Sequence, residues 1–463
     1  MMIIKPNFHK ELLRYYLSAF LIFSILLGNF YLLEGFLYIG IIKIAFFIAV
    51  LFFLLFLYNR YENLSSKAKR VNILYLFYFL YLFLVSLVYY FDDASRIIIE
   101  SSIYFLKVNM WLCIFFLILY NKLFKVEKVV YLIVIIGILF SLSAIINFFS
   151  SDLELFNIPR YQLNLPRIEQ SLETVGIFGF YTPGRTAYYF SEAAKFAQFL
   201  LGPLFLSIGL YKITKKKKFI LFSLLLITAI LLTNSLAAFI TLLMIIPVIF
   251  LFNKGKFAVS FILILLFIVF FFIGGALSFL YVNPEIEGSE YLTKTFTKSS
   301  TINVKIVEYL TIMEILRNNW FGIQGVFRVP YSMVYSEYMK HNWVDVGGGF
   351  SIGLFDDLAR GGIVGLIFRC VILYTLVMLF HKKFNDKHDV MFKYSLFTYF
   401  ALFIMSTSYG PYDSYQNLFY LALSIYLYEQ GFKMSQKEGE KYITTSDSSK
   451  SKRKYIFITA KQE

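Results

Sequence analysis

Stretches of about 20 apolar residues, separated by polar segments, recur along most of this chain. A helix of that length crosses the roughly 30 Å hydrocarbon core of a bilayer and satisfies its own backbone hydrogen bonds. The composition agrees, because 59% of the 463 residues are hydrophobic and only 16% are charged, whereas soluble domains have about 45–50% and about 25%. The sequence therefore predicts an all-α polytopic integral membrane protein.

Windows of roughly 18–21 residues give about twelve transmembrane helices. Only Asn234 and Ser235 separate the seventh and eighth of these spans, and a single span there would invert the topology of everything that follows. We expect one membrane domain over 1–430 and a cytoplasmic tail, 431–463, whose polar Ser- and Lys-rich composition predicts disorder. The expected spans lie near 14–33, 36–58, 71–90, 103–120, 129–149, 188–211, 219–233, 235–252, 257–281, 358–380, 394–409 and 415–430.

The distribution of Lys and Arg predicts the orientation of these spans. With the N-terminus in the cytoplasm, about 29 of these residues fall inside and about 11 outside. Lys254 and Lys256 fall inside only if the seventh and eighth spans are separate. We therefore expect both termini in the cytoplasm. The net charge of +15 reflects basic loops that face anionic lipid headgroups, so no nucleic acid is expected as a partner.

Two expected external segments, 150–187 and 282–357, are longer than the other turns. A large polar loop on the outer side is typical of an enzyme that works at the membrane surface, and channels or simple permeases rarely need one. Within the second segment, residues 304–316 predict an amphipathic helix that lies on the outer membrane surface. The alternative is a helix that packs over the bundle. Its polar set is Lys305, Glu308, Thr311 and Glu314, and its apolar set is Val304, Val307, Leu310, Met313 and Leu316.

The first external segment supplies candidate anion ligands. Arg160 and Arg167 each follow a proline, and Arg185 follows a Pro-Gly turn just before the sixth span. Arginine stays charged and meets phosphate oxygens with two parallel hydrogen bonds, so these residues suit a diphosphate headgroup. Glu192 and Lys195 lie one turn apart in the sixth span. Either they form a structural ion pair, or Glu192 lines a cavity in which Lys195 and Arg185 bind the anion.

His341 is the candidate general base, because it alone of the four histidines is expected outside. Its ordinary pKa of about 6.5 suits proton transfer from a sugar hydroxyl. An ordinary surface histidine is the alternative interpretation. The other candidate bases are Asp345, Glu337, Asp356 and Asp357.

Two arginines accompany the tenth span. Arg360 directly precedes a glycine-rich stretch, 361–365, whose glycines predict close helix packing. Arg369 lies deeper in the same apolar run and needs a partner or water there, so we expect it to line a cavity. The sequence has no metal-ligand spacing, no nucleotide-binding glycine loop and no nucleophile elbow, which predicts chemistry without metal, nucleotide or other cofactor.

Several short motifs resemble those of the O-antigen polymerase and O-antigen ligase superfamily, over roughly residues 130–430. The pattern departs from the family at Leu236 and Lys305, where arginine is usual, and at Gln324, which interrupts glycines. The motifs are Gly184-Arg185 with Phe190-Ser191-Glu192-Ala193, Leu232-Thr233-Asn234-Ser235, the stretch from Leu316 to Gly325, and His341-Asn342 with the stretch from Leu358 to Leu366.

The resemblance implies a GT-C-like membrane glycosyltransferase in the bacterial cytoplasmic membrane. Such a polymerase joins undecaprenyl-diphosphate-linked oligosaccharide repeat units into O-antigen, capsule or exopolysaccharide at the outer face. Arg185 would stabilise the departing diphosphate, and His341 or Asp345 would accept the proton. Membrane lipid, a flippase and chain-length regulator proteins would be further partners. A ligase, or a non-enzymatic flippase or transporter for the same lipid, remains the alternative. The remaining candidate diphosphate ligands are Arg160, Arg167, Lys195, Lys305 and Arg360.

Overall fold

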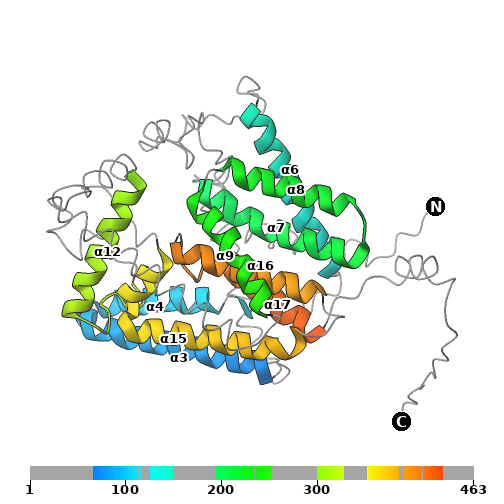
Figure 1. The fold of residues 1–463 in the computed structure, drawn as a ribbon. Coiled ribbons are helices and arrows are strands. Elements are labelled where there is room, and N and C mark those ends of the chain that lie inside the picture. Colours follow the sequence, from blue (N-terminus) through cyan, green and yellow to red (C-terminus); the bar gives the residue numbers. More distant parts are fainter. Residues whose placement is uncertain are drawn as a thin grey trace, which may run out of the picture.

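The computed structural model describes residues 66–109, 111–112, 114–115, 126–149, 193–233, 235–252, 300–327, 352–384, 390–408 and 410–430 (Figure 1). Regular structure in these segments is helical, apart from one isolated parallel bridge between Ile352 and Gly410. The helices are α3 (Ser66–Tyr90), η3 (Phe91–Asp93), α4 (Ala94–Val108), α6 (Val126–Phe149), α7 (Ala193–Thr214), α8 (Lys218–Leu232), α9 (Leu236–Phe252), α12 (Ser300–Asn318), α15 (Gly353–Phe384), α16 (Val390–Ser408) and α17 (Tyr415–Gln430).

Five described helical stretches are long and apolar enough to cross a membrane. The described residues are thus all-α with helices suited to a membrane, as the sequence predicts, while the count of twelve spans stays a prediction. The expected spans at 14–33, 36–58 and 257–281 and the tail at 431–463 lie outside the described residues. The five stretches are Ala68–Val108, Val126–Ile146, Ala194–Thr214, Gly353–Met378 and Val390–Thr407.

Two boundaries bear directly on the predicted topology. The apolar run on either side of Ser235 forms two helices, α8 with 15 residues and α9 with 17, so a single continuous helix there is excluded and two separate spans stay a prediction. The fourth span was expected from residue 103, but α4 begins at Ala94. The side chain of Asp93 accepts a hydrogen bond from the backbone N–H of Arg96 and caps the earlier start.

Helices α7 and α16 form the centre of the bundle. Their candidate spans are 78% and 83% buried, against 33% for the stretch that contains α3 and α4. Helix α16 packs against α7, α9 and α17, and α7 also packs against α6 and α8. Helices α3 and α15 pack together at the periphery, where the rings of Tyr81 and Phe368 lie 5.6 Å apart.

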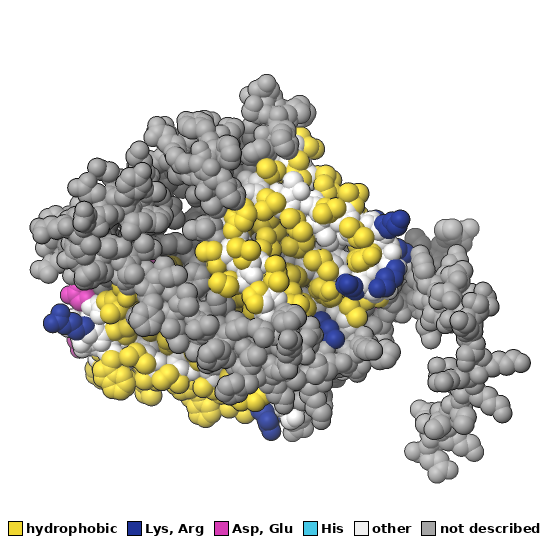
Figure 2. Space-filling view, viewed as in Figure 1, with side chains coloured by type: hydrophobic (Ala, Val, Ile, Leu, Met, Phe, Trp, Pro, Cys, Tyr) yellow, Lys and Arg dark blue, Asp and Glu magenta, His cyan; other side chains and the backbone are white. Residues whose placement is uncertain are grey.

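The peripheral helices present apolar side chains to the outside. On α15 these side chains recur every three or four residues and form one stripe along the helix. Figure 2 shows the apolar surface continuing over α3 and α15 along the lower edge of the molecule. Contiguous apolar surface of this kind fits contact with lipid chains. The stripe on α15 consists of Ile363, Ile367, Val371, Tyr374 and Met378.

The two ends of the bundle differ in character. Helix α12 and the first turns of α15 lie at one end (Figure 1), and the loop between α7 and α8 lies at the other. That loop carries Lys215, Lys216, Lys217 and Lys218, which contribute to the basic patch at the right of Figure 2. This separation fits an outer end that holds α12 and a cytoplasmic end that holds the lysines.

Candidate functional site

Helix α15 is broken at Gly362, whose φ of 58° and ψ of −151° are not helical. The segment 319–327, which follows α12 and is called the docking loop below, fills the break. The backbone oxygen of Ala359 accepts hydrogen bonds from the N–H groups of Ile323 and Gln324, at 2.9 and 3.0 Å. The N–H of Ile363 donates to the oxygen of Trp320 at 2.9 Å. The loop therefore satisfies backbone groups that a continuous helix would pair internally.

The glycines were expected to serve helix packing, and the structure corrects this at one position. Gly361 does pack closely, since an added Cβ would lie 3.0 Å from Tyr81 and from Leu82 of α3. Gly362 instead creates the break, because its backbone conformation strongly favours glycine and a Cβ would collide with the oxygen of Trp320. A Gly-Gly pair in an apolar helix is compatible with both roles, so the sequence alone did not distinguish them.

Helix α3 anchors the docking loop from the other side. The Tyr81 hydroxyl lies 2.8 Å from the backbone oxygen of Gly361 and 3.0 Å from that of Phe321. Ser86 Oγ accepts a hydrogen bond from the N–H of Val326 at 2.8 Å. Three segments far apart in the sequence, namely α3, the docking loop and α15, thus form one hydrogen-bonded junction at the end of the bundle that holds α12.

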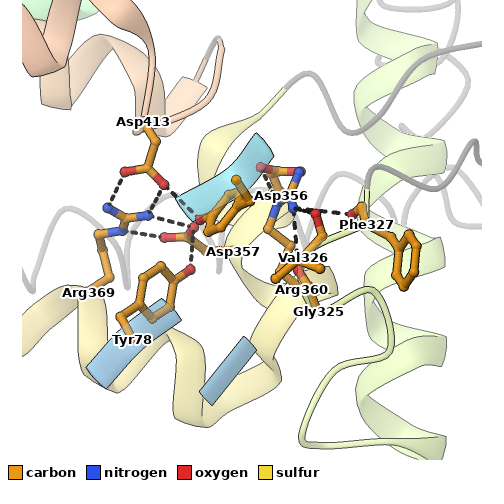
Figure 3. Close-up of polar contacts among 10 residues, drawn as sticks. Tyr78, Gly325, Val326, Phe327, Asp356, Asp357, Arg360, Arg369 and Asp413 are labelled. Carbon is orange, nitrogen blue, oxygen red and sulfur yellow. Dashed lines mark hydrogen bonds and ion pairs between the residues drawn. The ribbon is translucent and has the colours of Figure 1, made fainter. Parts of the chain in front are cut away.

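Arg360 is held at this junction by its guanidinium group (Figure 3). Nε donates to Asp356 Oδ2 at 2.9 Å, and Nη1 lies 3.2–3.4 Å from the backbone oxygens of Gly325, Val326 and Phe327. No hydrogen bond within the described residues uses Nη2. The side chain is 5% exposed and its guanidinium lies 5.2 Å from the ring centre of Tyr104. Arg360 is therefore a fixed cation with one uncommitted nitrogen.

Arg369 lies between two carboxylates (Figure 3). It donates to Asp357 at 2.7 and 3.0 Å and to Asp413 at 2.8 and 2.9 Å, so four of its five N–H groups are bonded. The hydroxyls of Tyr78 and Tyr104 donate to Asp357 and Asp413, each at 3.0 Å. Arg369 is 2% exposed. Arg369 was expected to need a partner, and the carboxylates of Asp357 and Asp413 are that partner. Its role in lining a cavity stays a prediction.

Asp413 lies in the turn between α16 and α17, outside the candidate spans. Burial alone would raise its pKa, but the Arg369 charge and hydrogen bonds, with a contribution from Lys107, lower it to about 2. Asp413 is therefore ionised at neutral pH. The carboxylates of Asp356, Asp357 and Asp413 are each paired with the guanidinium group of Arg360 or Arg369. A hydrogen-bonded group of paired charges is suited to hold the helices in place.

Helix α12 turns a different face inward from the one expected. Met313 of the predicted apolar face is 40% exposed, whereas Glu308 and Thr311 of the predicted polar face are 2% and 0% exposed. Buried Tyr309 of α12 packs on Phe355 of α15, with ring centres 5.9 Å apart. The helix packs over the bundle, as the alternative interpretation held. The inward face is mixed, because Ile312 and Ile315 are fully buried together with Glu308 and Thr311, so the three-residue pattern of polar positions did not identify it.

The remaining predicted site residues divide into two groups. Lys305 lies on α12 and Lys195 in the first turn of α7, where it is half-buried. The others lie outside the described residues, so their roles stay predictions. They are the candidate bases His341, Asp345 and Glu337, the anion ligands Arg160, Arg167 and Arg185, and Glu192.

Sequence reasoning missed Asp413 and the two tyrosines, Tyr78 and Tyr104, that bind the carboxylates. One signal was present for Asp413, because an acidic residue in the short turn between the last two spans lies close to membrane depth and needs a cation. Tyrosines are frequent in this chain, which has 36 of them, so Tyr78 and Tyr104 carried no distinguishing signal.

The described residues form an all-α bundle with helices suited to cross a membrane and with a buried Arg–Asp network at the end that holds α12. Comparison of the chain with protein-family models, with curated protein sequences and with solved structures finds no match.

Proposed function

We propose that this protein is a polymerase that joins undecaprenyl-diphosphate-linked oligosaccharide repeat units at the outer face of a bacterial cytoplasmic membrane. The observation that carries the proposal is the state of Arg360. Asp356 and the docking loop fix its guanidinium, and Nη2 remains free to bind an anion. A permanently charged group that is already immobilised loses little entropy when it binds phosphate oxygens. Its place beside α12, at the end opposite the lysine-rich loop, fits a substrate on the outer side.

In this proposal a sugar hydroxyl of one lipid-linked unit attacks the anomeric carbon of the chain on another. The bond between that carbon and the diphosphate oxygen breaks, and undecaprenyl diphosphate leaves with the electron pair. Arg360 stabilises the negative charge that grows on the leaving oxygen. The lipid diphosphate supplies the driving force, so the step needs no nucleotide.

The hydroxyl proton passes to a general base, for which His341 and Asp345 remain the sequence candidates. Asp357 is a poor candidate, because both of its oxygens accept hydrogen bonds from Arg369 and one also accepts from Tyr78. Asp356 is half-buried and binds Arg360 through Oδ2. Its role is to orient the anion-binding guanidinium.

A transporter for the same lipid is the second candidate function. The buried Arg369 network favours it, since ionisable residues inside spans often mark a transport pathway. Against it, every carboxylate of that network forms an ion pair with an arginine. Such a network suits a structural role better than a transport pathway that must open and close. A ligase would use the same donor site with a different acceptor.

The test is the length distribution of surface polysaccharide in a deletion strain that carries wild type, Arg360→Lys or Arg185→Ala. Lysine keeps the charge but loses the planar guanidinium, so we expect single repeat units from Arg360→Lys at normal membrane level. Arg317→Lys, an exposed arginine on α12, is the matched control and should restore long chains. Long chains without an anchor in the deletion strain would instead indicate a ligase. Lipid-linked units on the cytoplasmic face would indicate a flippase.

A further inference from the structure

Gln324 is buried in the docking loop with an unsatisfied side chain. It is 1% exposed, and neither Oε1 nor Nε2 of its amide has a hydrogen-bond partner within the part of the chain that the structure describes. Its backbone, by contrast, is fully engaged. The N–H donates to Ala359 at 3.0 Å and the oxygen accepts from Phe327 at 3.0 Å. The backbone thus fixes where the amide lies, and the amide itself remains available.

A buried primary amide without partners is unusual, because it has two donors and an acceptor that lose water on burial. Other polar side chains at the junction, such as Ser86, Tyr81 and Asp356, do have partners. The amide of Gln324 therefore keeps its donors and its acceptor for a polar group of a ligand. A hydroxyl group matches an amide well, since each both donates and accepts.

Gln324 directly precedes the segment that holds Arg360. The backbone oxygens of the next three residues lie around Nη1 of Arg360, while Nη2 of the same guanidinium is uncommitted. The docking loop and its anchor thus carry two unused polar groups, one cationic and one neutral. A sugar joined to a diphosphate presents this same pair of features, with a charged group and a hydroxyl a short distance apart.

We propose that Gln324 is a sugar-recognition residue, whose amide binds a hydroxyl of the sugar attached to the diphosphate that Arg360 binds. The inference rests on the proposed function and adds the determinant of sugar preference. Because the amide is enclosed, the hydroxyl must be enclosed with it, and a sugar that lacks this hydroxyl leaves both amide groups unpaired. Enclosed polar recognition of this type discriminates strongly between related substrates.

The experiment compares the binding of two probes to the purified full-length protein in nanodiscs. One probe is undecaprenyl diphosphate, and the other is the lipid-linked repeat unit extracted from the deletion strain. Gln324→Met keeps the length of the side chain and removes its hydrogen bonds. We expect this variant to bind the repeat unit about tenfold more weakly and undecaprenyl diphosphate as wild type does. Gln198→Met, which alters a buried glutamine on α7 with an unpaired Nε2, is the matched control and should change neither.

Other outcomes separate the inference from the function on which it rests. Unchanged binding of both probes by Gln324→Met would mean that water alone fills the site, which overturns the inference and leaves the polymerase proposal intact. An equal loss of both probes would mean that Gln324 only supports the loop, and this also overturns the inference. If wild type binds neither probe, the proposed function itself fails. Should Gln324→Met not fold, as judged by its melting temperature, Gln324→Asn supplies the same comparison.

Discussion

Asp357 and Arg369 are joined by two hydrogen bonds of 2.7 and 3.0 Å although twelve residues separate them on α15. In a continuous α-helix, residues twelve apart are separated by about 18 Å along the axis, which these side chains do not bridge. The break at Gly362 removes this separation. The same break receives the docking loop, so one glycine makes possible both the ion pair and the attachment of α12.

Gly362→Ala should therefore disrupt the junction. The methyl group would collide with the oxygen of Trp320, and alanine disfavours a φ of 58°. We expect a loss of about 3 kcal/mol or more, because backbone strain and loss of a buried ion pair combine. The measurement is the melting temperature in detergent. Gly365→Ala is the control, since its Cβ would lie 3.3 Å from the nearest atom and needs only a small adjustment. Equal melting temperatures for the two variants would contradict the assigned role.

Removal of Arg369 should be more damaging than removal of the whole network. Arg369→Leu leaves the carboxylates of Asp357 and Asp413 buried without their cation, at a cost of about 3–5 kcal/mol. Arg369→Lys should rescue little, because an ammonium does not reproduce the two paired contacts. The variant in which Arg369, Asp357 and Asp413 are all leucine should recover part of the lost stability. Folded protein is measured by size-exclusion chromatography, and a triple variant that is worse than Arg369→Leu would show that the network is a net source of stability.

The ionisation of Asp413 predicts how stability depends on pH. Its pKa of about 2 lies below the ordinary value of 3.8, so the native state favours the charged form. This contributes stability on the order of 2 kcal/mol above about pH 5, and the contribution is lost as the pH falls from about 5 to 2. Asp413→Asn should be less stable at neutral pH and should lose less on acidification. Melting curves at several pH values test this, with exposed Asp92→Asn as the control. If the melting temperatures of wild type and Asp413→Asn fall equally as the pH is lowered, the prediction is contradicted.

Local features of the junction could be predicted from sequence, and long-range ones could not. The positions of the helices follow from the apolar runs, because a helix needs about 20 apolar residues to cross the hydrocarbon core of the membrane. Asp356 and Arg360 are four residues apart on a helix, which is the spacing of an intrahelical ion pair. Arg369 at membrane depth had to find a partner. These inferences need only neighbours along one helix.

The identity of that partner required the tertiary fold. Asp413 follows Arg369 by 44 residues and reaches it only because α16 returns the chain to the end of the bundle at which α15 begins. The docking loop binds α3 across more than 200 residues, as the 240-residue separation of Ser86 and Val326 shows. The burial of Glu308 could not be predicted for a related reason. A helical period defines two faces of α12 and does not say which of them packs against the bundle.

Trp320 provides an optical test of where the junction lies in the bilayer. It is 53% exposed beside Phe321 in the docking loop, whereas Trp111 is fully buried. Exposed tryptophans of membrane proteins favour the headgroup level. With Trp111 and Trp343 changed to Phe, we expect Trp320 fluorescence to be quenched more by lipids brominated near the headgroup than by lipids brominated at the chain ends. The reverse order would place the junction deep in the membrane and remove the support for an outer-surface site.

The orientation of the bundle is tested by labelling single cysteines. Three expected spans separate the lysine-rich loop from α12, so the two should lie on opposite sides of the membrane. In a background with Cys113 and Cys370 changed to Ala, exposed Arg317→Cys should react in intact cells with a maleimide that does not cross membranes. Exposed Lys217→Cys should react only after permeabilisation, because the loop 215–218 carries four lysines and obeys the positive-inside rule. Labelling of both positions in intact cells would show that one expected span between them does not cross. The side of the membrane on which Arg360 lies would then be determined by labelling single cysteines close to the start of α15.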